Sequence, residues 1–180
     1  MLPLFEWIQD VGFLAAIRES AMVYPIIMAT HLSCIALFGG MILMTDMRLL
    51  GLGLKRYTVS EVVNALRTPK RVGFVLMVTM GLLLACSEAV KYYHNPYFWV
   101  KLTLLACVGV HALIFRPTVY NHPEEIDKLP ALPSRAKAAA VLSLVIWTGV
   151  LTMGRLIGYY EGDKTQKTVQ VQVEHAAENR

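Results

Sequence analysis

The sequence is poor in charged residues and in cysteine. Only 17% of its 180 residues are Asp, Glu, Lys or Arg, whereas 56% are hydrophobic. An average soluble domain has about 25% charged and about 45–50% apolar residues, and a chain of this length has too small an interior to bury so much apolar surface. The three cysteines all have apolar neighbours and do not indicate a disulfide framework. The composition therefore indicates a membrane protein.

Several common functional signals are also missing. The sequence has no phosphate-binding loop, nucleophile elbow or metalloprotease motif. Its net charge of +4 forms no basic stripe, so we expect no nucleic-acid partner. The first nine residues contain neither Lys nor Arg, so the positively charged start of a secretory signal is absent. We therefore look for functional residues within the apolar segments.

Four apolar segments predict transmembrane helices in contact with a lipid bilayer. They cover residues 21–45, 72–93, 97–116 and 138–160, each close to the roughly 20 residues that cross a bilayer. Before them, residues 1–19 place apolar side chains at helical spacing opposite Glu6, Gln9 and Asp10, which predicts an amphipathic helix in the membrane interface. We expect an all-α fold, in which residues 20–160 form an integral membrane four-helix bundle behind an N-terminal interfacial amphipathic helix.

The distribution of basic residues predicts the orientation of the bundle. Six Lys and Arg residues lie in 46–71 and four in 116–137, against seven on the opposite side. The positive-inside rule therefore places both loops in the cytoplasm of a bacterial inner membrane. Both termini, including the polar tail at 161–180, are then on the outer, periplasmic side.

Within the tail, residues 168–174 alternate polar and apolar side chains, which favours an extended strand. A strand on its own has no sheet to join, so it would pair with another membrane or periplasmic subunit. A disordered polar tail is the alternative.

Two histidines inside the predicted spans are the main functional candidates, because a polar ring is costly to place in hydrocarbon. His31 lies ten residues into the first span and His111 fourteen into the third, or about 15 Å and about 21 Å at 1.5 Å per residue. Both spans run in the same direction, so the two rings are expected at similar depths. Such a pair can supply both axial ligands of a haem. Lys101 and Arg155 lie toward the outer side, where they can pair with propionates, and His94 can hydrogen-bond a propionate or a quinone headgroup.

Two other interpretations stay open. Each histidine can simply be hydrogen-bonded within the bundle, with no cofactor bound. Alternatively, His31 and Cys34 on one helix face can meet Cys107 and His111 on another, because each pair has helical spacing. Two imidazoles and two thiolates would form a tetrahedral site for zinc or copper.

Two segments carry a resemblance to known proteins. One is His31 followed by Gly39, Gly40 and the run Asp46–Gly51, and the other is Asn95–Lys101. Together they resemble small bacterial four-helix membrane proteins of uncharacterised function. More distantly, they resemble membrane-embedded b-type cytochromes and copper-resistance D-type proteins.

The resemblance to b-type cytochromes implies His31 and His111 as haem ligands, and quinol or a periplasmic protein as redox partner. We therefore expect a haem b electron-transfer subunit of a respiratory or redox complex, without catalytic chemistry of its own. The alternatives are a haem-free structural or assembly subunit and a copper-handling membrane protein.

Overall fold

The computed structural model describes the backbone of residues 2–178 and the side chains of residues 2–160. Every regular element in this part of the chain is helical. The elements are α1 (Leu2–Gln9), α2 (Gly12–Glu19), α3 (Val23–Leu50), α4 (Val59–Ser87), α5 (Ala89–Tyr93), α6 (Pro96–Phe115), the π-helical turn η1 (Arg116–Tyr120), α7 (Pro123–Asp127) and α8 (Ser134–Glu178). The expected all-α bundle is confirmed.

Four stretches of helix are long and apolar enough to cross a membrane, which makes the chain a multi-pass membrane protein. They are Val23–Leu50, Val59–Ser87, Pro96–Tyr120 and Ser134–Tyr160. Their apolar side chains largely face outward, as Leu37, Leu113 and Val145 show with exposed fractions of 70%, 76% and 63%. So large an apolar surface on every side is suited to contact with lipid rather than water.

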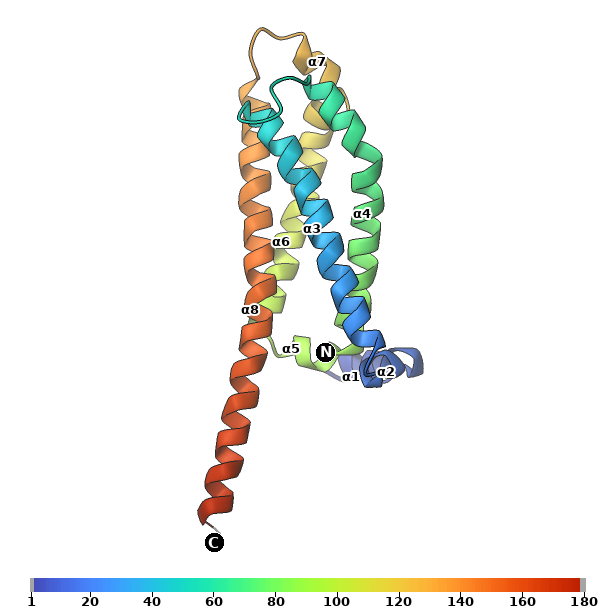
Figure 1. Ribbon diagram of the computed structural model, residues 1–180, viewed down its shortest axis with the longest axis vertical. Helices are drawn as coiled ribbons and strands as arrows, with labels where there is room; N and C mark the ends of the chain where they lie inside the picture. Colours follow the sequence, from blue (N-terminus) through green and yellow to red (C-terminus); the bar gives the residue numbers. More distant parts are fainter. Residues whose placement is uncertain (1, 179–180) are drawn as a thin grey trace.

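The long helices alternate in direction (Figure 1). α3 and α6 run from the end of the bundle that carries α1, α2 and α5, called the α5 end, toward the end that carries α7, called the α7 end. α4 and α8 run back. α3 packs against both α4 and α8, and α8 also packs against α6, whereas α4 and α6 make no comparably extensive contact within residues 2–178. The order across the bundle is therefore α4, α3, α8 and α6.

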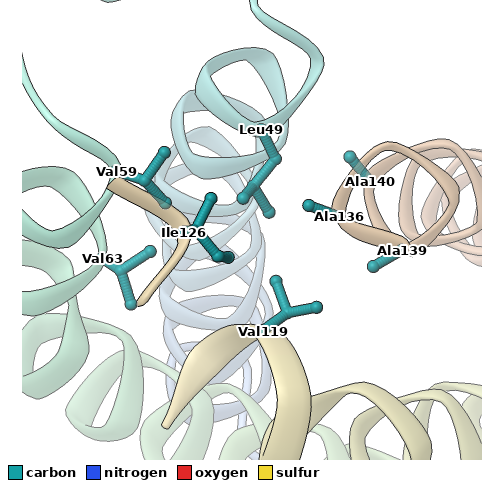
Figure 2. Packing of buried hydrophobic residues seen from close by; sticks show 8 residues of the cluster. All are labelled: Leu49, Val59, Val63, Val119, Ile126, Ala136, Ala139 and Ala140. Atoms are coloured by element: carbon teal, nitrogen blue, oxygen red, sulfur yellow. The ribbon is translucent and has the colours of Figure 1, made fainter. Parts of the chain in front are cut away.

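The best-packed apolar core lies at the α7 end (Figure 2). Side chains from α3, α4, η1, α7 and α8 meet there, and they are Leu49, Val59, Val63, Val119, Ile126, Ala136, Ala139 and Ala140. The three alanines are fully buried, because a small side chain lets α8 approach the other elements closely. This end of the bundle is held together by protein packing as well as by lipid.

α4 begins thirteen residues before the expected start of the second span. Thr58 caps it, because its hydroxyl accepts the backbone N–H of Glu61 at 3.1 Å and the Glu61 carboxylate accepts the N–H of Thr58 at 2.6 Å. This reciprocal capping box satisfies two N–H groups that a helix start leaves unpaired. Residues 46–71, expected as a loop, are therefore mostly helical.

α4 also ends earlier than expected, at Ser87 rather than at residue 93. Glu88 interrupts the helix with φ −124° and ψ 43°, and α5 starts a new helix at Ala89. Gln9 accepts the backbone N–H of Val90 through Oε1 at 3.1 Å, so a side chain from α1 replaces a bond that the interrupted helix lacks.

The two ends of the chain differ from the expectation in detail. The amphipathic segment is two short helices, α1 and α2, which lie across the α5 end (Figure 1).

The prediction of a strand at residues 168–174 is wrong, because α8 continues as helix to Glu178. Extending an existing helix adds one hydrogen bond per residue without a new nucleation step, whereas a lone strand leaves its N–H groups unpaired. The expected contact of this tail with a partner depends on side chains outside the described residues.

Asp127 joins α7 to the start of α4. Its Oδ1 accepts the N–H of Val59 at 2.8 Å and its Oδ2 that of Ser60 at 3.0 Å. Partial burial would raise the pKa of Asp127, but the hydrogen bonds from Ser60 and Val59 and the nearby charge of Arg48 outweigh it and hold the pKa below its usual value. The carboxylate is therefore an ionised cap for α4.

We predict that Asp127→Ala lowers the free energy of unfolding by about 1 kcal/mol, because two N–H groups at the start of α4 lose their acceptor. Denaturant unfolding in micelles measures this, with the exposed neighbour Glu125→Ala as the control. Since the pKa of Asp127 is lowered in the folded state, the advantage of the natural residue is complete above about pH 4 and is lost as the pH falls through the folded-state value. Equal unfolding midpoints for both variants would show that the cap adds no stability.

Candidate functional site

His31 of α3 is held against α4 by one hydrogen bond. Its Nδ1 lies 2.9 Å from the backbone oxygen of Met77. A carbonyl oxygen only accepts, so Nδ1 carries the hydrogen and donates, and in the neutral ring Nε2 keeps its lone pair. Among the described residues Nε2 has no hydrogen-bond partner. The bond thus fixes both the orientation of the ring and the nitrogen that is available to a ligand.

A glycine on α4 and a lysine on α6 complete the surroundings of this ring. A Cβ atom at Gly81 would lie 2.8 Å from Cε1 of His31, closer than such atoms approach, so only glycine lets the ring lie here. The ammonium group of Lys101 is near enough to act electrostatically on His31. The same Nζ lies 3.6 Å from the position of a Cβ on Gly154 of α8. We call His31, Gly81, Lys101 and Gly154 the histidine site.

Two other residues expected near a cofactor point elsewhere. Arg155 donates to the hydroxyl of Tyr159 at 3.1 Å, and its guanidinium lies 4.7 Å from the centre of that ring. His94 is exposed and donates through Nδ1 to the backbone oxygen of Val90 at 3.0 Å. Of the cations expected to pair with propionates, Lys101 alone acts on His31 in the described part of the chain.

A second group of polar side chains lies near the α7 end, and we call it the buried polar layer. It consists of Thr45 and Asp46 of α3, Lys70 of α4, His111 of α6 and Ser143 of α8. Thr45 and Asp46 are 1% exposed, Ser143 is 5% exposed and His111 is 8% exposed. Nζ of Lys70 donates to Oγ1 of Thr45 at 2.9 Å, and the side chain of Ser143 is hydrogen-bonded to Asp46. Nε2 of His111 donates to the backbone oxygen of Ala139, one turn from Ser143, at 2.9 Å.

The structure does not bring His31 and His111 together. His31 and Asp46 are fifteen residues apart on α3, and Lys101 and His111 are ten apart on α6, which gives about 22 Å and about 15 Å at 1.5 Å per residue. Two imidazole nitrogens on one metal ion would be about 4 Å apart, twice a typical bond of about 2 Å. Similar depths were expected from the sequence, but α3 starts only eight residues before His31 whereas α6 starts fifteen before His111, so His111 lies deeper in the bundle.

The alternative zinc or copper site is not assembled either. Cys34 is half-buried and Cys107 is exposed, and His31 and His111 lie at different levels. Within the described residues, no group of three or more His, Cys, Asp or Glu side chains lies close enough to hold a metal ion.

Sequence reasoning missed four members of the buried polar layer, namely Thr45, Asp46, Lys70 and Ser143. Asp46 and Lys70 were assigned to a loop, although the sequence contains the capping box of Thr58 and Glu61 that starts α4. A helix beginning there carries Lys70 more than two turns inward. Ser143 could not be singled out from the sequence, because a single serine in an apolar span is common and does not indicate a buried polar site.

Comparison with known proteins places the chain in one family. No curated protein and no solved structure matches it. The expected relation to small membrane proteins has support from the four apolar helices, whereas these comparisons provide no link to b-type cytochromes or copper-resistance proteins. One family model, described as a family of unknown function (DUF6644), matches residues 4–160, which run from α1 to the end of the fourth membrane-spanning stretch. Because this match covers most of the chain, the protein belongs to the DUF6644 family.

Proposed function

We propose that the protein is a membrane haem b protein in which His31 binds the iron, and that it passes single electrons between quinone and a partner at the α5 end. The hydrogen bond from Nδ1 of His31 to Met77 is the observation that carries this proposal. A metal-binding histidine commonly donates its other N–H to a backbone carbonyl, which orients the ring and raises its basicity. Nε2 of His31 is left for the metal.

The surroundings of His31 fit a flat, partly charged ligand. Gly81 gives the ring itself room against α4, and α4 and α6 make no extensive contact with each other within residues 2–178. Lys101, whose charge acts on His31, would supply a positive charge for a propionate. A bound haem would supply one-electron chemistry, while the chain holds the iron, pairs the propionate charge and excludes water with its apolar helices.

His111 is not a ligand in this proposal, because it lies seven residues farther into its helix than His31 does, which is about 10 Å along the bundle, and its Nε2 is hydrogen-bonded to Ala139. The proposal also gives the bundle an orientation in a bacterial inner membrane. The basic residues of 46–71 and 116–137, near the α7 end, face the cytoplasm by the positive-inside rule. The histidine site is then nearer the periplasmic face, where a periplasmic or membrane-bound subunit can exchange electrons with it.

The ligand assignment predicts different spectra for two histidine variants. We expect His31→Ala to lose the Soret band and the reduced α-band of the purified protein, and added imidazole to restore them, because imidazole can occupy the ligand position. His111→Ala and the double variant Cys34→Ala, Cys107→Ala are expected to keep both bands. A natural protein without haem absorption would favour the haem-free structural subunit, and full haem content in His31→Ala would overturn the ligand assignment.

A matched pair of glycine variants tests the position of the ring. Gly81→Ala is expected to lower haem occupancy about tenfold, the lower end of effects seen when the support of a metal ligand is disturbed, because its Cβ would lie 2.8 Å from Cε1 of His31. Gly109→Ala makes the same chemical change on α6, where nothing lies within 4 Å of the new atom, and should bind haem normally. Equal occupancy in the two variants would argue against haem binding beside Gly81.

The orientation is tested by cysteine labelling in a chain whose three natural cysteines are replaced by alanine. Glu19 and Lys128 are exposed at the α5 end and the α7 end. We predict that a membrane-impermeant thiol reagent added to whole cells modifies Glu19→Cys but not Lys128→Cys. The reverse pattern would place the α7 end outside and would exclude a periplasmic partner at the α5 end.

A further inference from the structure

Asp46 has two carboxylate oxygens in unequal surroundings. The residue is 1% exposed, and the side chain of Ser143 is hydrogen-bonded to it. Oδ2 is buried and has no hydrogen-bond partner among the described residues. Buried polar atoms in native proteins are nearly always hydrogen-bonded, so an exception requires an explanation. The proposed haem site makes no use of this carboxylate.

Charged and titratable groups face Asp46 from the elements around it. On α4, Lys70 acts on Asp46 electrostatically, and Arg67 acts in turn on Lys70. From η1, Tyr120 is also within electrostatic range of Asp46. His111 faces the layer from α6. Lys70 does not neutralise the carboxylate by direct contact, because no nitrogen of Lys70 lies within 4.0 Å of a carboxylate oxygen in the described part of the chain.

An ionised Oδ2 in this position is unfavourable, because a buried charge requires hydrogen bonds or a counter-ion in contact. A metal ion would relieve it, but the ammonium group of Lys70 repels a cation, and no cluster of three or more metal-ligating side chains is present among the described residues. A proton needs only the one oxygen and removes the charge altogether. The surroundings of Oδ2 therefore favour a proton over a metal ion.

A polar stripe on α4 leads from water at the α7 end toward this carboxylate. Ser60, Asn64, Arg67 and Lys70 follow one another at spacings of four, three and three residues, so they lie on one face of the helix. Asn64 is exposed and donates to Glu124 of α7 at 3.2 Å. Arg67 donates to the backbone oxygen of Tyr120 at 3.0 Å, and Lys70 reaches Thr45, the residue before Asp46.

We propose that Asp46 is a reversible proton-binding site of the bundle, loaded from water at the α7 end along the polar stripe. Binding forms one O–H bond at Oδ2 and turns the carboxylate into a neutral carboxylic acid. Release returns the proton to water by the same route. The site is independent of haem, since it lies about 22 Å from His31 along α3.

Infrared spectroscopy of the full chain in lipid nanodiscs tests the proposal directly. We expect a C=O stretching band of a protonated, buried carboxylic acid that is present at acidic pH and disappears as the pH rises. Asp46→Asn keeps the size of the side chain and should remove this band. Asp127→Asn, which changes an exposed carboxylate at the same end of the bundle, should retain it.

A lysine pair provides a second measurement that does not depend on the folding of Asp46→Asn. Lys70→Met removes a nearby positive charge that favours the ionised carboxylate, so the midpoint of the band should move to higher pH by about one unit or more. Lys55→Met makes the same change at an exposed position at this end and should leave the midpoint in place. A band that persists in Asp46→Asn, or a midpoint unmoved by Lys70→Met, would overturn the proposal.

Discussion

The close approach of α3 to α4 is the contact on which the rest of the bundle depends. Three positions on α4, spaced by four residues, line this contact. Cβ atoms at Gly73 and Gly81 would meet the side chains of Phe38 and His31 of α3, and between them the backbone oxygen of Met77 accepts the hydrogen bond of His31. Helices in lipid gain little from hydrophobic burial, so small residues and interhelical hydrogen bonds decide how they pair.

The other face of α3 packs against α8. Both proposed sites, the histidine site and the proton-binding site at Asp46, include a residue of α3. The ring of Phe38 lies 5.4 Å from that of Trp147 on α8, and 5.8 Å from that of Phe74 on α4. His31 lies on the α5 side of this aromatic contact and Asp46 on the α7 side. Because a continuous helix fixes their separation, the two sites can be altered one at a time, and the variants proposed for each leave the other unchanged.

Hydropathy alone predicted the four spans and their alternating directions, because a bilayer requires about 20 apolar residues per crossing. The start of α4 could also have been predicted from the sequence. Thr58 and Glu61 form a capping box, and Val59, Val62 and Val63 follow at helical spacing. Because residues 46–71 were expected to form a loop, Asp46 and Lys70 were not recognised as residues inside the bundle.

Other features could not have been predicted from this sequence. The relative depths of His31 and His111 depend on where each helix begins, and an error of two residues at each start changes the difference by about 6 Å. The partners of both rings are backbone oxygens, of Met77 and Ala139, which every residue possesses and which leave no trace in the sequence. The helical course of residues 168–174 reflects continuity with α8 rather than the local alternation of side chains.

The carboxylate that caps α4 comes from a residue 68 positions later in the chain. Chains are synthesised from the N-terminus, so α3 and α4 are complete before Asp127 has been made. During that interval the start of α4 has only the local capping box of Thr58 and Glu61. Because Asp127 follows α6 in the chain, it can bind Val59 and Ser60 only after both the α3–α4 hairpin and α6 have been synthesised.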